Sequence, residues 1–132
     1  MTYQPKFFQW HEFDQRNAPG TGKKHMDVDF VKWLDELRLR CNFPLVVSSG
    51  YRSPEYNQKV SSTGPNGPHT TGKAADVTVL GSQALTVISH ATAMGVMGLG
   101  VKQKGSHGRR FIHLDMLENH ETAGPRPWVW SY

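Results

Sequence analysis

Cysteine is nearly absent from this sequence, since Cys41 is the one example among 132 residues. No disulfide can therefore form within the chain. Cys41 stands at the end of a helical pattern of apolar residues, so we interpret it as a small packed side chain and not as a nucleophile. The length of the chain predicts a single domain over 1–132 with one hydrophobic core.

Long apolar runs are missing as well. No stretch approaches the roughly 20 residues of a membrane span, and MTYQPKFFQWHEF lacks the basic-then-apolar order of a signal peptide. We therefore expect a protein that is cytoplasmic when made, or that leaves the cell by another route, and that has no membrane partner. The net charge of +4 is a mild bias, compatible with an anionic partner such as cell wall or nucleic acid.

Three segments have the spacing of apolar residues that is typical of helices. The segment 27–41 predicts a helix with Asp27 as its N-cap. The segment 53–60 begins Ser-Pro-Glu and predicts a helix with proline in its first turn. The segment 82–95 predicts a third helix, which Ser82 would cap and Gly95 would end, with its inward face formed by Leu85, Val87 and Ile88.

Four other segments favour strands, because β-branched and apolar residues gather between glycine-rich turns. They are 44–52, 72–80, 99–103 and 109–117, and the last two predict an antiparallel pair. The proline-broken tail GPRPWVWSY is expected to pack onto the domain. Helices and antiparallel strands in one small chain predict an α+β fold, with a small antiparallel sheet and helices on one face.

One carboxylate interrupts an apolar strand in the stretch PHTTGKAADVTV (68–79). Because alternate residues of a strand share a face, Asp76 lies opposite Ala75, Val77 and Val79. In the last strand His113 lies opposite Ile112, Leu114 and Met116 by the same rule.

If both apolar faces meet the helices, Asp76 and His113 point out of the other face of the sheet, and His69 can join them from the preceding loop. Three such ligands leave one coordination position open, as in catalytic zinc sites. The same residues are also compatible with a solvated histidine and an edge-strand aspartate.

The segments SSGYRSPEYN, HTTGKAADV, GLGV and RRFIHLD follow one another in this order and at this spacing. Together they resemble the zinc D,D-peptidases of the M15 family, in particular its subfamily A, which share a fold with the hedgehog signalling domain and the D-Ala-D-Ala dipeptidases. The resemblance covers roughly residues 7 to 117. It implies one Zn²⁺ ion held by His69, Asp76 and His113. It also implies that Arg52 grips the substrate near the scissile bond, and that Gly72 lets the backbone turn tightly beside the metal.

Two positions depart from the family pattern. The family usually has serine two residues before the first ligand, where this chain has Gly67. Many relatives also carry a carboxylate shortly before the last ligand, where this chain offers His107. We predict that His107 is the general base and that Asp115 orients a ligand imidazole, with the exchanged assignment as the alternative. The remaining histidines have no informative spacing and are expected at the surface: His11, His25, His90 and His120.

The resemblance implies hydrolysis of peptidoglycan stem or cross-link peptides, as a D-Ala-D-Ala carboxypeptidase or a D,D-endopeptidase. The enzyme would be a monomer without a nucleic-acid partner. It would be either a phage endolysin released by a holin or carried in the virion, or the trimmed mature form of an exported protein.

Two alternatives remain open at this point. One is a non-catalytic zinc-binding module of the same fold. The other is an iron oxygenase that uses His113, Asp115 and His120, although the number of predicted strands is too small for a double-sheet jelly roll.

Overall fold

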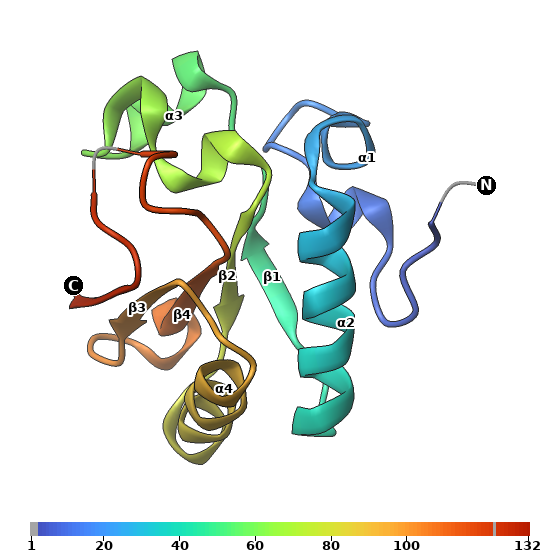
Figure 1. The fold of residues 1–132 in the computed structure, drawn as a ribbon, viewed down its shortest axis with the longest axis vertical. Coiled ribbons are helices and arrows are strands. Elements are labelled where there is room, and N and C mark those ends of the chain that lie inside the picture. Colours follow the sequence, from blue (N-terminus) through green and yellow to red (C-terminus); the bar gives the residue numbers. More distant parts are fainter. Residues whose placement is uncertain (1–2, 123) are drawn as a thin grey trace.

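Five strands form one mixed sheet in the computed structural model, which describes residues 3–122 and 124–132 (Figure 1). Their spatial order is β1-β2-β4-β3-β5, and the strands are β1 (Val46–Ser49), β2 (Ala74–Thr78), β3 (Gly98–Lys102), β4 (Phe111–Asp115) and β5 (Trp128–Ser131). The predicted α+β class is confirmed, and so is the antiparallel β3–β4 pair. The sheet is not antiparallel throughout, because the tail adds β5 alongside β3 in the parallel direction.

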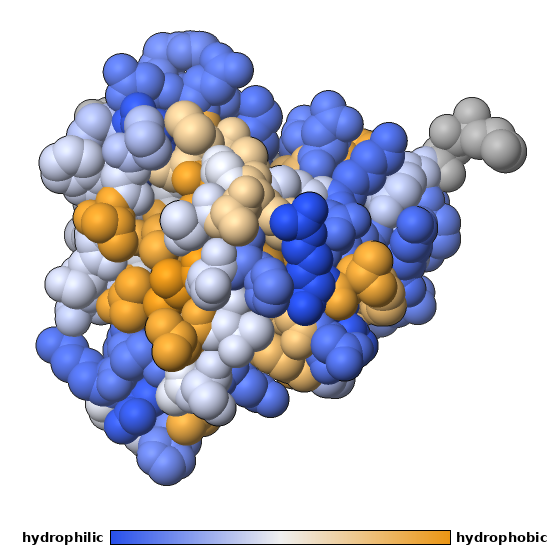
Figure 2. All heavy atoms as spheres, turned by 60° about the horizontal axis from the view of Figure 1, so that its bottom comes forward, coloured by the Kyte–Doolittle hydropathy of each residue, from blue (hydrophilic) through white to orange (hydrophobic). Residues whose placement is uncertain are grey.

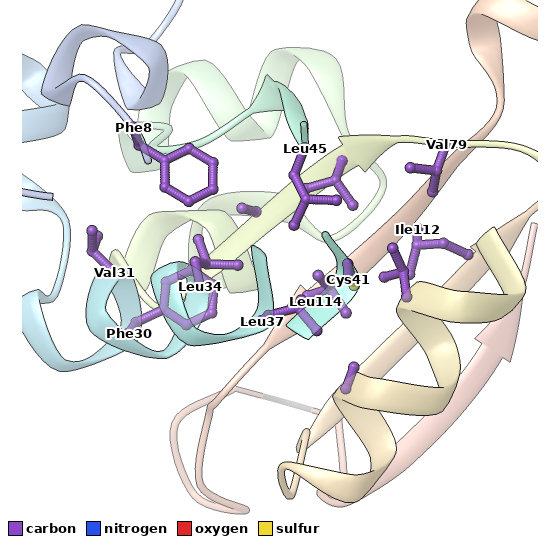
Figure 3. Packing of buried hydrophobic residues seen from close by; sticks show 14 of the residues in the cluster. Phe8, Phe30, Val31, Leu34, Leu37, Cys41, Leu45, Val79, Ile112 and Leu114 are labelled. Atoms are coloured by element: carbon purple, nitrogen blue, oxygen red, sulfur yellow. The ribbon is translucent and has the colours of Figure 1, made fainter. Parts of the chain in front are cut away.

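Two helices, α2 (Val28–Cys41) and α4 (Gly81–Ala93), pack on one face of this sheet (Figure 1). Helix α2 begins as predicted, because the Asp27 carboxylate accepts a hydrogen bond from the Phe30 backbone N–H at 3.0 Å. It ends at Asn42, which adopts a left-handed conformation with φ of 60°. Figure 3 shows the core between these helices and the strands, which includes Phe30, Leu34, Leu37, Cys41, Ile112 and Leu114.

Helix α4 differs from the prediction in its start and in its buried face. It begins at Gly81, and its N-cap residue is Leu80, which makes no side-chain cap, so the predicted capping by Ser82 is wrong. The inward stripe is Ala84, Val87 and Ala91, whereas Leu85 is 68% exposed. A residue one position along a helix is turned by about 100°, so the stripe that contains Ala84 excludes Leu85.

The other side of the sheet is covered by short elements and not by long helices. They are α3 (Pro54–Val60), η2 (Gly64–Asn66) and η3 (Pro68–Thr71), which lie beside the C-terminal segment in Figure 1. Helix α3 begins as predicted, with Ser53 accepting the Tyr56 N–H at 3.2 Å. Residues 74, 76 and 78 of β2 and residues 111, 113 and 115 of β4 point toward this side, where a cavity forms.

The N-terminal segment is tied to α2 by one buried carboxylate. Asp35 is 4% exposed and accepts the backbone N–H groups of Lys6 at 2.9 Å and Phe7 at 3.0 Å. It also accepts the hydroxyl of Tyr3, and burial together with this bond raises the pKa of Tyr3 to about 12. The segment continues into η1 (Trp10–Phe13) and α1 (Thr21–His25), which pack against each other.

The surface is mixed in character. Figure 2 brings the α4 end of Figure 1 forward and shows apolar side chains gathered on one part of this face, with hydrophilic side chains around them. Within residues 3–122 and 124–132, no helix has both the length and the apolar character that a membrane span needs.

Candidate metal centre

The structure brings His69, Asp76 and His113 together. Asp76 and His113 are direct partners in the β2–β4 register, and His69 enters from η3. Oδ1 of Asp76 lies 2.9 Å from Nδ1 of His113 and 3.3 Å from Nε2 of His69. One ligand atom of each residue lies within 4.8 Å of the other two, and all three side chains are buried.

A glycine makes the turn between His69 and β2 possible. Gly72 has φ of +77°, and a Cβ atom at this position would lie 2.1 Å from the carbonyl oxygen of His25. The Gly72 carbonyl also accepts the Asp27 backbone N–H at 2.9 Å, at the start of α2. The position therefore requires glycine for its conformation and for the close approach of two segments.

The outer nitrogen of each imidazole faces an acceptor. Nδ1 of His69 lies 2.7 Å from the Gly50 carbonyl oxygen, and Nε2 of His113 lies 2.7 Å from Oδ2 of Asp115. A carbonyl or carboxylate can only accept, so these outer nitrogens carry hydrogen. The inner nitrogens face Asp76 and are the ones that a metal ion would bind; at His113 the ion would displace the proton that Nδ1 donates to Asp76. Two imidazole nitrogens and one carboxylate oxygen at a common point fit a zinc ion with one open position.

The charges of the cluster are strongly coupled. Burial by itself would raise the pKa of Asp76, but the His69 and His113 imidazoles outweigh burial and hold it below its usual range. Burial would lower the pKa of His113, and hydrogen bonds to Asp115 and Asp76 raise it instead. The cluster therefore holds a carboxylate and attracts positive charge, which is the electrostatic condition for binding a cation.

Asp115 is held from behind by a residue that the sequence did not indicate. Arg126 donates from Nε to Oδ1 and from Nη2 to Oδ2 of Asp115, both at 3.0 Å. Burial would raise the pKa of Asp115, but its bonds to His113 and Arg126 lower it. Gly98 makes room for this pair, because a Cβ atom there would lie 2.1 Å from Oδ2 of Asp115.

Trp130 of β5 covers the other side of His113. The two ring centroids are 5.0 Å apart, and the Arg126 guanidinium lies 5.3 Å from the centre of the Trp130 ring. Gly100 allows this approach, since a Cβ atom there would lie 2.6 Å from the indole nitrogen. The sequence did hold one signal for this packing: the alternate glycines of GLGV, Gly98 and Gly100, leave one face of β3 without side chains at these positions, so large side chains from neighbouring segments can lie over it.

Arg52 lies at the cavity above the cluster, which has a volume of about 450 Å³. Its Nη1 donates to Oδ1 of the buried Asn57 at 3.2 Å. The Asn57 amide nitrogen in turn donates to the Thr63 hydroxyl at 2.9 Å. A Cβ atom on Gly67 would lie 2.1 Å from that hydroxyl oxygen. Thr63 therefore fills the space that a side chain at position 67 would need.

The other predicted candidates lie apart from the cluster. His107 lies in η4 (His107–Arg109) and is exposed. It is not among the described residues that line the cavity. His120 has a side chain that is 78% exposed and pairs with Glu118 at 3.7 Å. Because Asp115 is engaged by His113 and Arg126, the alternative iron triad of His113, Asp115 and His120 is not formed. His25, predicted at the surface, is exposed and stacks on Tyr51 with ring centroids 4.3 Å apart.

A family model described as Peptidase M15 matches residues 7–115. The chain therefore belongs to the M15 peptidase family, and the resemblance seen in its motifs is confirmed at this level. Among curated proteins, none matches the chain at the significance required. The match contains the three clustered ligand candidates and Asp115, and it ends before Arg126 and Trp130.

Proposed function

We propose that this M15 peptidase is a zinc enzyme that hydrolyses peptidoglycan stem or cross-link peptides. One observation carries the proposal: two imidazole nitrogens and one carboxylate oxygen converge at the base of a cavity that Arg52 also lines. The donor set suits zinc, and the cavity gives a peptide access to it.

His69, Asp76 and His113 would hold the ion, with Gly50 and Asp115 fixing the orientation of the two imidazoles. A zinc ion in this site would polarise the scissile carbonyl and lower the pKa of a water molecule. The three ligand side chains are at most 10% exposed, so the protein side of the site is closed to bulk water.

Arg52 is proposed to bind the substrate carbonyl or a carboxylate next to it. Its guanidinium offers several N–H groups in one plane, which match two acceptor oxygens. Asn57 holds one nitrogen of this fork at 3.2 Å, so α3 sets the orientation of the side chain. Such pre-orientation lowers the cost of stabilising negative charge as it develops.

For the proton transfer, the two candidates keep the roles proposed from the sequence. Asp115 is fully buried and its oxygens face His113 and Arg126, which supports an orienting role. His107, in the loop between β3 and β4, is proposed as the proton carrier. Its side chain is exposed, so this role is the first one to test.

The cell wall as the site of action is proposed from the family resemblance and from the net charge. A net charge of +4 favours association with an anionic wall. A single-domain phage endolysin or an exported bacterial hydrolase would both meet this description, acting as a monomer.

The test is incubation of purified sacculi with zinc-loaded protein, followed by mass analysis of the released fragments. We expect peptide fragments from the native protein and none from His69→Ala, together with about one zinc per chain before the substitution. Intact sacculi at full zinc occupancy would instead support a non-catalytic zinc-binding module. Bound iron in place of zinc would contradict the proposed metal.

A further inference from the structure

We propose that a groove beside the metal-site cavity binds a neutral N-acetylated sugar of the substrate glycan. The groove, called here the indole groove, has a volume of about 430 Å³. It is lined by Trp128 and Trp130 of β5 and by Ser62, Asn66 and Pro68 from the segment that contains η2 and η3. This inference rests on the proposed function, because it names the part of the substrate that occupies the space beside the metal-site cavity.

The indole groove is continuous with the cavity above the metal centre. The two spaces share four lining residues, which are Ser62, Thr63, Pro68 and Trp130. Trp130 also packs against His113, so one indole joins the groove to the ligand cluster. A substrate bound above the three ligands therefore has a direct path into the groove.

Among the residues that the structure describes, the groove offers no charged side chain that could pair with an ionic group of a ligand. Arg126 is its one charged lining residue, and its side chain is 4% exposed. Its guanidinium donates to Asp115 through two nitrogens and to the Pro125 carbonyl through the third. The remaining lining side chains are aromatic, hydroxyl, amide or proline, so a neutral occupant fits and the ionised residues of a stem peptide do not.

A second cleft, which meets the cavity at Arg52 and Val60, does carry charged side chains. Arg16 and Arg52 both line that cleft, and its carboxylate, Asp14, accepts the backbone N–H groups of Gly20 and Gly22. The two ends of the binding region therefore differ in charge. The carboxylate-bearing peptide would extend toward Arg52, and the uncharged sugar toward Trp128.

An N-acetylated sugar matches the groove in its chemistry. A pyranose ring presents an apolar C–H face and an edge of hydroxyl and amide groups. Trp128 and Trp130 are alternate residues of β5 and so share a face, while Ser62, Asn66 and Thr122 add hydroxyl and amide groups to the lining. Trp128 is 56% exposed, as expected of an aromatic side chain that gains its packing partner when a ligand binds.

The test compares one peptide with and without its sugar. The substrates are a disaccharide-peptide fragment of the wall and the same peptide after an amidase has removed the disaccharide. For the native protein we expect a KM roughly tenfold lower for the disaccharide-peptide, because a tenfold ratio corresponds to about 1.4 kcal/mol and lies within the range of one well-packed aromatic contact. Trp128→Ala should remove most of this difference, and Trp128→Phe should retain part of it.

Val129→Ala is the matched control, because Val129 neighbours Trp128 in β5, is 63% exposed and does not line the groove. It should leave the KM ratio unchanged. Equal KM values for the two substrates in the native protein, or an unchanged ratio in Trp128→Ala, would overturn the sugar site.

Failure of the proposed function would look different, because neither substrate would then be cleaved. In that case the disaccharide alone is titrated while tryptophan fluorescence is recorded. A change that saturates in the native protein and is lost in Trp128→Ala supports the sugar site even without peptidase activity. The absence of a change in the native protein overturns it.

Discussion

At the scale of single residues, the candidate centre depends on which nitrogen of each imidazole carries hydrogen. His69 and His113 use opposite ring nitrogens for the inner position, Nε2 and Nδ1 respectively. The acceptors behind them, the Gly50 carbonyl and Asp115, decide this assignment. A change in either acceptor should therefore act on metal affinity before it acts on chemistry.

Asp115→Asn tests that argument directly. The substitution removes the charge that His113 and Arg126 share, and it leaves the buried guanidinium without its carboxylate. We expect zinc affinity to fall about 10–100-fold, measured by competition with a chelator of known affinity. Turnover at saturating zinc should fall less than affinity does. An inactive Asp115→Asn protein at full zinc occupancy would assign the general base to Asp115 instead.

His107→Ala tests the proton carrier. A positioned general base contributes about 10²–10⁴ to the rate, so a loss of that size in kcat/KM at fixed zinc occupancy would support the role proposed from the sequence. The proposed role therefore predicts a loss of that size, whereas a loss of less than tenfold would show that this exposed side chain, which does not line the cavity, has no part in the proton transfer. His11→Ala, at another exposed histidine, is the control and should leave kcat/KM unchanged.

Arg52→Lys separates the charge of this side chain from its shape. Lysine keeps the positive charge but loses the planar fork and the bond to Asn57. We expect kcat/KM to fall at least about 100-fold, in line with the loss of one oriented donor, with zinc content unchanged. Steady-state kinetics and metal analysis on the same sample measure both. A fully active Arg52→Lys protein would identify Arg52 as a turn residue that has no part in binding substrate.

At the scale of elements, the attachment of the N-terminal segment to α2 depends on Asp35. This buried carboxylate accepts two backbone N–H groups and one phenol. Asp35→Asn removes the charge and forces an amide N–H toward at least one donor. We expect it to lower the free energy of unfolding by about 2–3 kcal/mol, because hydrogen bonds to charged groups contribute about 1.5–3 kcal/mol.

Urea unfolding measures this loss, and Glu36→Gln is its control on the same helix. Glu36 forms an exposed pair with Arg40 at 3.0 Å, and such pairs contribute only about 0.3–0.5 kcal/mol. Similar effects of the two substitutions would show that the segment is not held through Asp35.

At the scale of the whole molecule, the metal centre joins segments that are distant in the sequence. Its ligand candidates come from η3, β2 and β4, and residues behind them come from the turn after β1 and from the C-terminal segment. A ligand that binds only the folded state stabilises it by about 2.7 kcal/mol at 100 times its Kd. We expect removal of zinc by a chelator to lower Tm by roughly 10 °C, measured by calorimetry. The Tm of His69→Ala should not respond to the chelator.

The local elements were predictable because their signals are local. Asp27 and Ser53 cap their helices through bonds that span three residues, and both helices begin where the sequence predicts. The inward face of α4 was predicted wrongly at Leu85, because its apolar residues allow two overlapping stripes. Packing against α2 selects between those stripes, and no local signal records that contact.

Alternation along two strands predicted a common face for Asp76 and His113, on the condition that both apolar faces meet the helices. The order and register of the strands turned that shared face into a cluster, since Asp76 and His113 are direct partners only because β2 lies beside β4. Only the tertiary structure brought in Arg126 and Trp130, through a parallel strand from a tail that has no clear periodicity. The period of a strand is set by its own backbone, whereas its neighbours are chosen by burial and hydrogen bonding between segments far apart in the chain.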